Sequence, residues 1–515
     1  MRYPERIDAR AAFGKCSCEE EIDFYTDDYE KYFFDQAPFN KEILDPVSYL
    51  IVGRRGSGKT SLTQYLNFQD TILDSLHIDV DEPSAYEDVL TQVADSGAQD
   101  FEVALKRVVK IWELLIWSLI FDRLGIEPSH ASLILSEKEV FVEKTAAKKI
   151  KIILERLNRM SPERYESLPF DVTEQMESEE FKIMRARALS VSEDTPLLIS
   201  IDSLERYSVR NEGMMRATAA LIEAACNFNT KFSSVGIHVK IFISDEIYPF
   251  LSETAISNTL KYIKDPVFLR WRPKDVIRLI AFRYYLFLSK RDFQVPPMSD
   301  GDWQDFKVIR DKIWYPFFGR RIINRKGIEE NSFAYVLRHT QMRPRQMIEI
   351  CNSMARISIG RREFPQFHPE TLRSAIEQRE KHLASEVVNS YTKVYENVGS
   401  IVDALHGLPI MLLGKALDKV AQRTASQWPS GEYSPYKFRQ LVAELGIVGS
   451  VRKHNEETGI VEADFEYNED DRLPLQTDQL CVFHPMFVRK LAIKNPRSLI
   501  VYPFPDHPDF ESMAG

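Results

Sequence analysis

The stretch SYLIVGRRGSGKTSLTQ, residues 48–64, decides the fold. Residues 53–60 match the pattern G-x-x-x-x-G-K-[ST] at every fixed position. The apolar residues 49–52 predict a buried strand before this octapeptide, and apolar residues at helical spacing predict an amphipathic helix after it. A chance match in an ordinary glycine-rich turn is the alternative. Because a strand and a helix flank the motif, the sequence favours a true P-loop and predicts that a nucleotide binds here.

The chemistry of a P-loop explains why these residue types are needed. Glycine lets the backbone turn tightly, so that successive N–H groups point into one concavity that suits phosphate oxygens. The helix that follows adds the positive end of its dipole. We expect Lys59 to reach the β and γ phosphates of ATP, and the Thr60 hydroxyl to bind Mg²⁺. The expected nucleotide-binding residues are Gly53, Arg54, Arg55, Gly56, Ser57, Gly58, Lys59, Thr60 and Ser61.

A second apolar run, in residues 195–205 (TPLLISIDSLE), ends in Asp202. A buried parallel strand has this pattern when its carboxyl end opens onto a ligand site. We expect Asp202 to hold Mg²⁺ together with Thr60. Many ATPases have a glutamate directly after this aspartate, but Ser203 occupies that position here. The nearest acid is Glu205, which is either the base that activates water or a side chain of the next helix.

Two further candidates come from later strand and helix ends. The apolar run in residues 238–248 (HVKIFISDEIY) predicts another buried strand. Ser244 at its end either senses the γ phosphate and orients water, or caps the next helix. A proline between two arginines, in residues 343–345, predicts a helix start that places a guanidinium at the first turn. Arg345 therefore either leans over a phosphate or caps the helix.

Composition narrows the class of protein. The formal net charge of −10 argues against a strongly basic nucleic-acid coat. The five cysteines are too few and too scattered for a disulfide framework, which predicts a cytoplasmic protein. Residues 1–10 lack the apolar core of a signal peptide. The most apolar segment, residues 111–126, is interrupted by Glu113 and Asp122, so it predicts a buried core helix and no contact with a membrane.

We predict an α/β fold with four parts. An arm and helix span residues 1–45, and an ATPase core with a parallel sheet spans residues 46–270, with a helical insertion over about 84–190. A helical lid covers residues 271–385, and a winged-helix domain covers residues 386–515.

The winged helix is predicted from a change of pattern near the C-terminus. Helical patterns over residues 397–405, 411–423 and 436–445 precede two strands around a polar turn, and further apolar runs follow. Such a domain binds DNA or docks a protein. Its expected recognition helix, residues 434–445, carries only Lys437 and Arg439 as bases, with Glu444 opposing them. This charge pattern favours protein contact, and DNA remains the alternative.

The order of these parts resembles that of AAA+-like and STAND-like P-loop ATPases, above all the origin-recognition type and a related group of bacterial stand-alone ATPases. The resemblance spans most of the chain, but only the P-loop is a specific motif. It is carried by residues 53–60, 199–202, 242–244 and 343–345 and by the predicted winged helix. The dipeptide at residues 13–14 and the stretch VFHPMF at residues 482–487 are similar to the bacterial group in particular.

This resemblance implies properties that the residues alone do not show. It implies that Arg345 is the lid arginine called sensor 2, that the core and lid close around nucleotide, and that the protein assembles into oligomers. The missing glutamate after Asp202 also fits this family, which includes slow hydrolysers that are used as switches. Members of the bacterial group work in genome conflict, including defence against phage, commonly beside a separate effector.

Three functions are therefore compatible with the sequence. The first is a regulatory switch that binds and hydrolyses ATP, as the ATPase component of an anti-phage defence complex. The second is an initiator or loader that recognises DNA through its winged helix. The third is a scaffold that binds nucleotide without hydrolysing it and holds an effector. The guanine-reading pattern N-K-x-D does not occur in the sequence, which favours ATP over GTP.

Overall fold

The computed structural model describes fourteen segments of the chain: residues 11–25, 29–34, 36–45, 47–65, 76–80, 83–95, 101–127, 145–159, 168–202, 207–255, 266–324, 326–469, 472–495 and 498–504. The chain divides into two compact units. One unit, Pro38–Leu269, is called the sheet unit here. The other unit, called the C-terminal unit, combines Met1–Ala37 with Arg270–Gly515.

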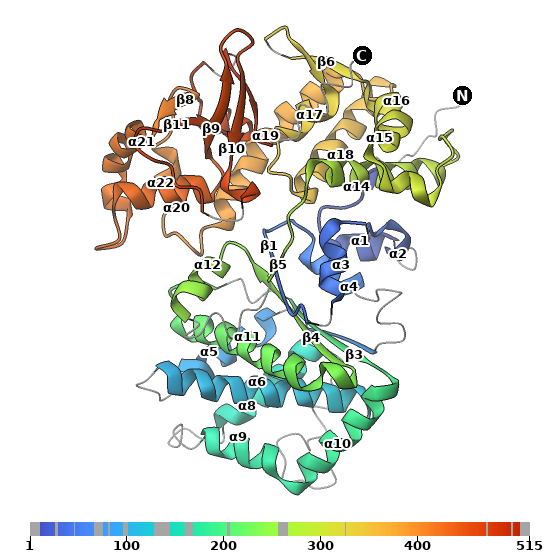
Figure 1. Ribbon diagram of the computed structural model, residues 1–515, viewed down its shortest axis with the longest axis vertical. Helices are drawn as coiled ribbons and strands as arrows, with labels where there is room; N and C mark the ends of the chain where they lie inside the picture. Colours follow the sequence, from blue (N-terminus) through green and yellow to red (C-terminus); the bar gives the residue numbers. More distant parts are fainter. Residues whose placement is uncertain are drawn as a thin grey trace. The chain divides into compact units, whose positions relative to one another are not determined.

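The sheet unit contains a five-stranded parallel sheet with the order β2-β3-β4-β1-β5 (Figure 1). Its strands are β1 (Leu50–Gly53), β2 (Leu76–Val80), β3 (Leu197–Asp202), β4 (Ile237–Ser244) and β5 (Val267–Phe268). Strands β1, β3 and β4 are buried along their whole length, which is why they read as nearly continuous apolar runs. The predicted α/β class with a parallel sheet is confirmed. Strand β5 is only two residues long.

Helices connect these parallel strands. Helix α4 (Lys59–Tyr65) follows β1, and α11 (Glu212–Phe232) lies between β3 and β4. Between β2 and β3 lie α5 (Glu87–Asp95), α6 (Phe101–Arg123), α8 (Ala146–Arg159), α9 (Leu168–Glu177) and α10 (Glu179–Asp194), as the helical pattern of that region predicts. The unit also includes α3 (Pro38–Leu44) before β1 and α12 (Tyr248–Phe250) after β4.

Helix α6 is the buried core helix that the sequence predicts. It runs beside α11 (Figure 1), and the Trp112 indole Nε1 donates a hydrogen bond of 2.9 Å to the Ala217 carbonyl of α11. The Trp117 ring lies 5.3 Å from the Phe228 ring of α11, measured between ring centroids. Both tryptophans are at most 2% exposed. No helix in the described segments is long and apolar enough to cross a membrane.

The C-terminal unit begins with helices packed around the N-terminal arm. The arm carries α1 (Cys18–Tyr25) and α2 (Tyr29–Tyr32). The later helices are α14 (Pro273–Ser289), α15 (Phe306–Ile309), α16 (Tyr315–Phe318), α17 (Ser332–Leu337), α18 (Pro344–Arg361) and α19 (Pro369–Ser390). A small antiparallel hairpin, β6 (Arg321–Ile323) and β7 (Glu329–Asn331), lies between α16 and α17.

Phe13 anchors the arm to these helices. Its ring is fully buried and stacks on the Tyr284 ring of α14 at a centroid distance of 4.6 Å. The Phe13 backbone N–H donates to Asn352 Oδ1 of α18 at 3.0 Å, and Asn352 Nδ2 donates to the Gly14 carbonyl at 2.8 Å. The buried carboxylate of Glu21 pairs with the Arg283 guanidinium of α14. These contacts explain why residues before position 38 belong to the same unit as residues after position 269.

The unit ends in a second sheet with three helices. The strand order is β12-β10-β9-β11-β8, with only the β10–β12 pair parallel. The strands are β8 (Met411–Leu413), β9 (Val448–Asn455), β10 (Ile460–Asp464), β11 (Leu480–Phe483) and β12 (Ile500–Tyr502), and the helices are α20 (Val398–Asp403), α21 (Gly414–Ala421) and α22 (Pro435–Glu444). The hairpin predicted before residue 469 is present as β9 and β10. The predicted helix over residues 411–423 is wrong at its start, because residues 411–413 pair with β11 as a strand.

Candidate functional site

Residues 53–60, called the glycine loop here, join β1 to α4. Gly56 and Gly58 have φ angles of 83° and 104°, which other L-residues rarely adopt. Gly53 has a different requirement, because a Cβ atom there would lie 2.5 Å from Ser57 Oγ and 2.9 Å from Leu269 Cδ1. The turn is closed by a hydrogen bond of 3.0 Å from the Ser57 N–H to the Arg54 carbonyl. The two fixed glycines of the motif are therefore required for different steric reasons: close contacts at Gly53, and a positive φ at Gly58.

Lys59 turns back toward the start of the loop. Its Nζ donates a hydrogen bond of 2.8 Å to the Gly53 carbonyl, and the residue is only 6% exposed. The Asp245 backbone N–H donates to the same carbonyl at 3.1 Å. A lysine ammonium held against the loop backbone is positioned to interact with a polyphosphate that enters the loop.

Thr60 and Asp202 meet across the sheet. The Thr60 Oγ1 donates a hydrogen bond of 2.7 Å to Asp202 Oδ2, although the two residues are 142 positions apart in the sequence. Asp202 is the last residue of β3 and is 4% exposed. The sheet order places β4 between β3 and β1, so the carboxyl ends of parallel strands bring these side chains to one edge.

This pair of oxygen ligands fits Mg²⁺. Magnesium is a hard cation that prefers oxygen, and it usually binds one or two protein oxygens together with water and substrate phosphates. The described segments contain no group of three or more His, Cys, Asp or Glu side chains that could hold a metal without such help. Thr60 and Asp202 could therefore supply the protein oxygens of a Mg²⁺ site, to which phosphate and water oxygens would add.

Ser244 lies beside the glycine loop, in register with Gly53 at the end of β4. Its hydroxyl donates to Glu246 Oε2, and Glu246 Oε1 accepts a hydrogen bond of 3.1 Å from the Arg55 backbone N–H. Glu246 is 4% exposed. Our sequence reasoning chose Ser244 from the tripeptide Ser-Asp-Glu and missed Glu246. The only local signal for Glu246 was its position two residues after the end of an apolar strand.

Two predicted residues are not joined to this group by the described contacts. Arg345 belongs to the C-terminal unit, near the start of α18, where its Nη1 donates to Glu386 Oε1 at 3.3 Å. Its role toward a phosphate stays a prediction, and so does the capping alternative. Glu205, the acid predicted as the base, lies outside the described residues.

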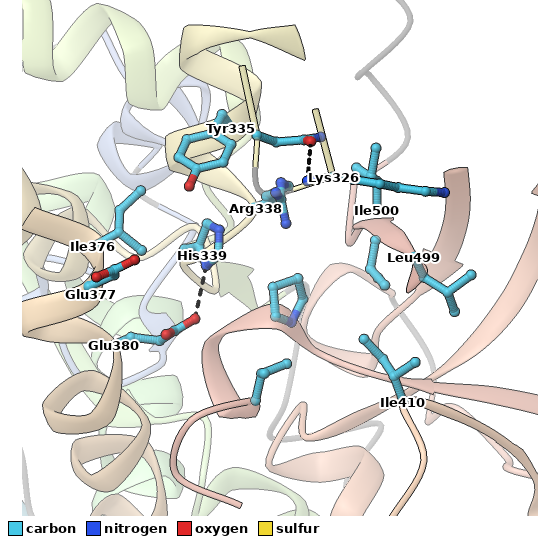
Figure 2. A pocket seen from close by; sticks show the side chains of 14 residues that line it. Lys326, Tyr335, Arg338, His339, Ile376, Glu377, Glu380, Ile410, Leu499 and Ile500 are labelled. Carbon is cyan, nitrogen blue, oxygen red and sulfur yellow. Dashed lines mark hydrogen bonds and ion pairs between the residues drawn. The ribbon is translucent and has the colours of Figure 1, made fainter. Parts of the chain in front are cut away.

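A separate pocket of about 70 Å³ lies within the C-terminal unit (Figure 2). Its polar wall includes Arg338, whose Nη2 donates to Glu330 Oε1 at 3.1 Å, and His339, whose Nδ1 lies 3.1 Å from Glu380 Oε1. The Tyr502 hydroxyl of β12 donates to Glu330 Oε2 at 2.6 Å. These contacts join the residues just after α17 to β7 and α19, and they join β7 to β12. None of the nucleotide-binding and catalytic residues predicted from the sequence lines this pocket.

No model of a protein family matches the chain, and no curated protein sequence is significantly similar to it.

Proposed function

We propose that this protein is a P-loop ATPase that binds ATP·Mg²⁺ and acts as a nucleotide-dependent switch. The observation that carries the proposal is the hydrogen bond between Thr60 and Asp202, because it unites the two motifs expected to share a magnesium ion. The strand order supports it, since β1, an inner strand of the parallel sheet, leads into the glycine loop. The Lys59 ammonium at the loop backbone supports it as well.

In this proposal some residues bind ATP·Mg²⁺ and others sense the γ phosphate. Residues 53–61, including Arg54 and Arg55, surround the phosphates, and Lys59 balances the negative charge of the phosphates. Thr60 and Asp202 orient the magnesium ion, which screens the phosphate charge when bound. Ser244 and Arg345 respond to the γ phosphate. Glu205 remains the base that the sequence suggests for hydrolysis.

The proposed output of the switch is contact with a protein, through self-assembly or an effector, in the cytoplasm. We propose that residues 386–515 form a winged helix whose α22 faces a partner. Its Arg439 pairs with Asp418 of α21, which leaves Lys437 as the remaining base of the helix. Tyr436 on the same helix is 60% exposed. An exposed tyrosine and little free positive charge favour a protein over a DNA phosphate backbone.

All five cysteines are free thiols, which fits a reducing compartment.

The experiment that tests the proposal measures equilibrium binding of ATP·Mg²⁺ and steady-state phosphate release for the wild type and Lys59→Ala. Hydrogen bonds to charged groups contribute about 1.5–3 kcal/mol, so the variant should bind ATP roughly 10- to 100-fold more weakly. Lys41→Ala, at an exposed position of α3, is the matched control and should bind ATP normally. Unchanged ATP affinity in Lys59→Ala would refute the site.

Duplex DNA added to the same assays separates the proposed switch from the alternatives. Phosphate release that is indifferent to DNA supports a protein-coupled switch. Release that rises with DNA and falls steeply with salt would favour the initiator or loader, because DNA phosphate contacts release counterions. Tight ATP binding without any turnover would leave a nucleotide-bound scaffold as the function.

A further inference from the structure

The pocket of about 70 Å³ in the C-terminal unit is lined both by residues of the helices and by residues of the second sheet. In Figure 2, Ile376 and Glu380 lie on one side of the pocket, Ile410 and Ile500 lie on the other side, and Arg338 lies between them. A water molecule needs about 10–15 Å³ of such space, so the pocket has room for roughly five to seven non-hydrogen atoms. A small organic molecule has this size.

Two buried hydrogen-bond donors in the wall of this pocket have no hydrogen-bond partner within the described segments. These donors are Asn324 Nδ2 and Arg338 Nε. Asn324 is 4% exposed, and its Oδ1 accepts from the backbone N–H groups of Lys326 and Ile328 at 2.8 and 3.1 Å. The side chain of Asn324 is therefore held in place. Because buried polar groups in proteins are nearly always hydrogen-bonded, the two donors call for an acceptor from outside the chain.

The Arg338 guanidinium is held in place but is only partly used. Its Nη2 donates to Glu330 Oε1 at 3.1 Å, and the guanidinium lies over the Tyr335 ring, 4.9 Å from the ring centroid. Among the described residues, Nη1 has no hydrogen-bond partner. The side chain is 11% exposed, so a molecule in the pocket can reach it. Since a guanidinium forms its strongest hydrogen bonds with ionised acceptors, a carboxylate is the partner that suits Arg338 best.

The acids of the pocket wall do not exclude an anion, because each of them has a basic partner. A nitrogen of Arg489 lies 3.9 Å from Glu380 Oε2, and another lies 4.0 Å from Glu377 Oε2. His339 Nδ1 also lies 3.1 Å from Glu380 Oε1. The nearby Glu330 is paired with Arg338 itself. The negative charges around the pocket are therefore balanced within the chain.

Lys326, which also lines the pocket, adds a positive charge. Its Nζ donates to the carbonyls of Thr458 and Ser498 at 2.7 and 3.1 Å. Carbonyl groups carry no net charge, so they leave the charge of the ammonium in place. Among the described residues, no acid pairs with Lys326. The electrostatic balance of the wall therefore favours a bound anion over a bound cation.

The rest of the wall is mostly apolar. Its aliphatic side chains are Ile376, Ile410, Val488, Leu499, Ile500 and Val501. We propose that this pocket binds a small aliphatic carboxylate, whose oxygens accept hydrogen bonds from Arg338 and Asn324 and whose hydrocarbon chain lies against the aliphatic wall. Such a ligand satisfies the buried donors and removes apolar surface from water at the same time. The proposal is independent of the proposed ATPase function.

The test measures the dissociation constants of four probes for the full chain by saturation-transfer NMR. The probes are butyrate, acetate, butyramide and butylamine. Butyrate should bind roughly 10-fold more tightly than acetate, because it buries two more methylene groups. It should also bind roughly 10-fold more tightly than butyramide, because hydrogen bonds to an ionised acceptor are stronger. Butylamine, a cation without an acceptor, should not bind.

Asn324→Asp changes only the donor. The aspartate keeps an oxygen that can accept from Lys326 and Ile328, but it replaces the Nδ2 donor with a negatively charged oxygen. Butyrate should bind at least 10-fold more weakly to this variant. The matched control is Asn455→Asp, an exposed turn residue outside the pocket, whose Oδ1 also accepts from two backbone N–H groups, at 3.0 and 3.1 Å. Its affinity for butyrate should stay within about threefold of the wild type.

Hydrogen exchange locates the bound probe. Butyrate should slow amide exchange in α19 and β12, which line the pocket, and should leave exchange in β3 and β4 unchanged. Slowing confined to β3 and β4 would place butyrate elsewhere and overturn the proposal.

Three results of the binding series would also overturn it. The first is that butyrate shows no saturable binding to the wild type, since water alone would then satisfy the buried donors. The second is equal affinity for butyrate and butylamine. The third is unchanged butyrate affinity in Asn324→Asp. The first two results come from the wild type alone, so they do not depend on the folding of a variant.

Discussion

At the scale of single residues, the contact between Thr60 and Asp202 leads to a prediction about magnesium. Asp202→Asn removes a charge but keeps an oxygen that can accept from Thr60. We expect the variant to lose roughly 10-fold or more in affinity for ATP in the presence of Mg²⁺, because charged oxygen ligands bind this hard cation best. In the presence of a chelator, ATP affinity should equal that of the wild type. Titration of a fluorescent ATP analogue with and without Mg²⁺ measures both.

An equal loss of ATP affinity in Asp202→Asn with Mg²⁺ and with the chelator would contradict this assignment. It would mean that Asp202 supports the glycine loop and has no direct role at the metal. Asp194→Asn, at the end of α10 and exposed, serves as the control and should behave as the wild type does.

Lys240 in the middle of β4 gives a prediction about pH. Burial lowers the pKa of Lys240 from 10.5 to about 7, although the nearby Asp45 acts in the opposite direction. Its Nζ donates to the carbonyls of Asp45 and Ser48 at 2.7 and 2.6 Å. Because the folded-state pKa lies below the unfolded-state pKa, the unfolded chain binds more protons between pH 7 and 10.5. The contribution of Lys240 to stability therefore rises with pH across this window.

Lys240→Met removes this titration. The free energy of unfolding of the wild type, relative to that of the variant, should rise by up to about 1.4 kcal/mol per pH unit above pH 7. Urea unfolding of both proteins at pH 7, 8 and 9 measures the difference. A difference that does not change with pH would show that Lys240 keeps its proton in the folded protein.

At the scale of elements, the turn between α11 and β4 depends on Gly236. This residue has a φ of 87°, and a Cβ atom there would overlap the backbone carbonyl oxygen of Ser192 at the end of α10. Gly236→Ala should lower the free energy of unfolding by about 2–4 kcal/mol, because φ strain and overlap with rigid backbone add. Gly125→Ala is the matched control: its φ is 63°, but its Cβ would meet open space.

Urea unfolding of the two glycine variants separates the cost of φ strain from the cost of overlap with the Ser192 backbone. The Gly125→Ala variant should lose only the cost of the backbone conformation, on the order of 1 kcal/mol. Equal losses of unfolding free energy in both variants would show that α10 can move away from the added methyl group without cost. The packing of α10 against the start of β4 would then be loose.

At the scale of the whole molecule, the division into two units makes the N-terminal arm part of the C-terminal unit. Phe13→Ala removes a fully buried ring that stacks on Tyr284. Such a truncation costs about 3–5 kcal/mol. We expect amide hydrogen exchange to accelerate in α14 and α18, the helices that contact the arm, and to stay unchanged in β3 and β4. Phe24→Ala, at a ring that is 37% exposed on α1, should have little effect. Acceleration of exchange spread evenly over both units would contradict the assignment of the arm to the C-terminal unit.

The local elements could be predicted because their signals are contiguous in the chain. The glycine loop, the strand before it and the strand ending in Asp202 each occupy fewer than about 20 residues, and apolar runs of this length identify buried strands. The start of the 411–423 segment was mistaken for helix because three apolar residues fit either a helix or a strand, and only pairing with β11 decides between them. The position of the arm could not be predicted either, because Phe13 contacts Asn352, which is 339 residues away in the sequence.

The sequence by itself determined the glycine loop, the parallel α/β class and the candidates Lys59, Thr60 and Asp202, because motif spacing and hydrophobic period are local properties. The tertiary structure decided which of these side chains meet. Strand register sets Thr60 against Asp202 and brings Glu246 to the Arg55 N–H, over separations of 142 and 191 residues. Sequence distance carries no information about such contacts. They depend on the order β2-β3-β4-β1-β5, which places the carboxyl ends of strands from distant parts of the chain at one edge.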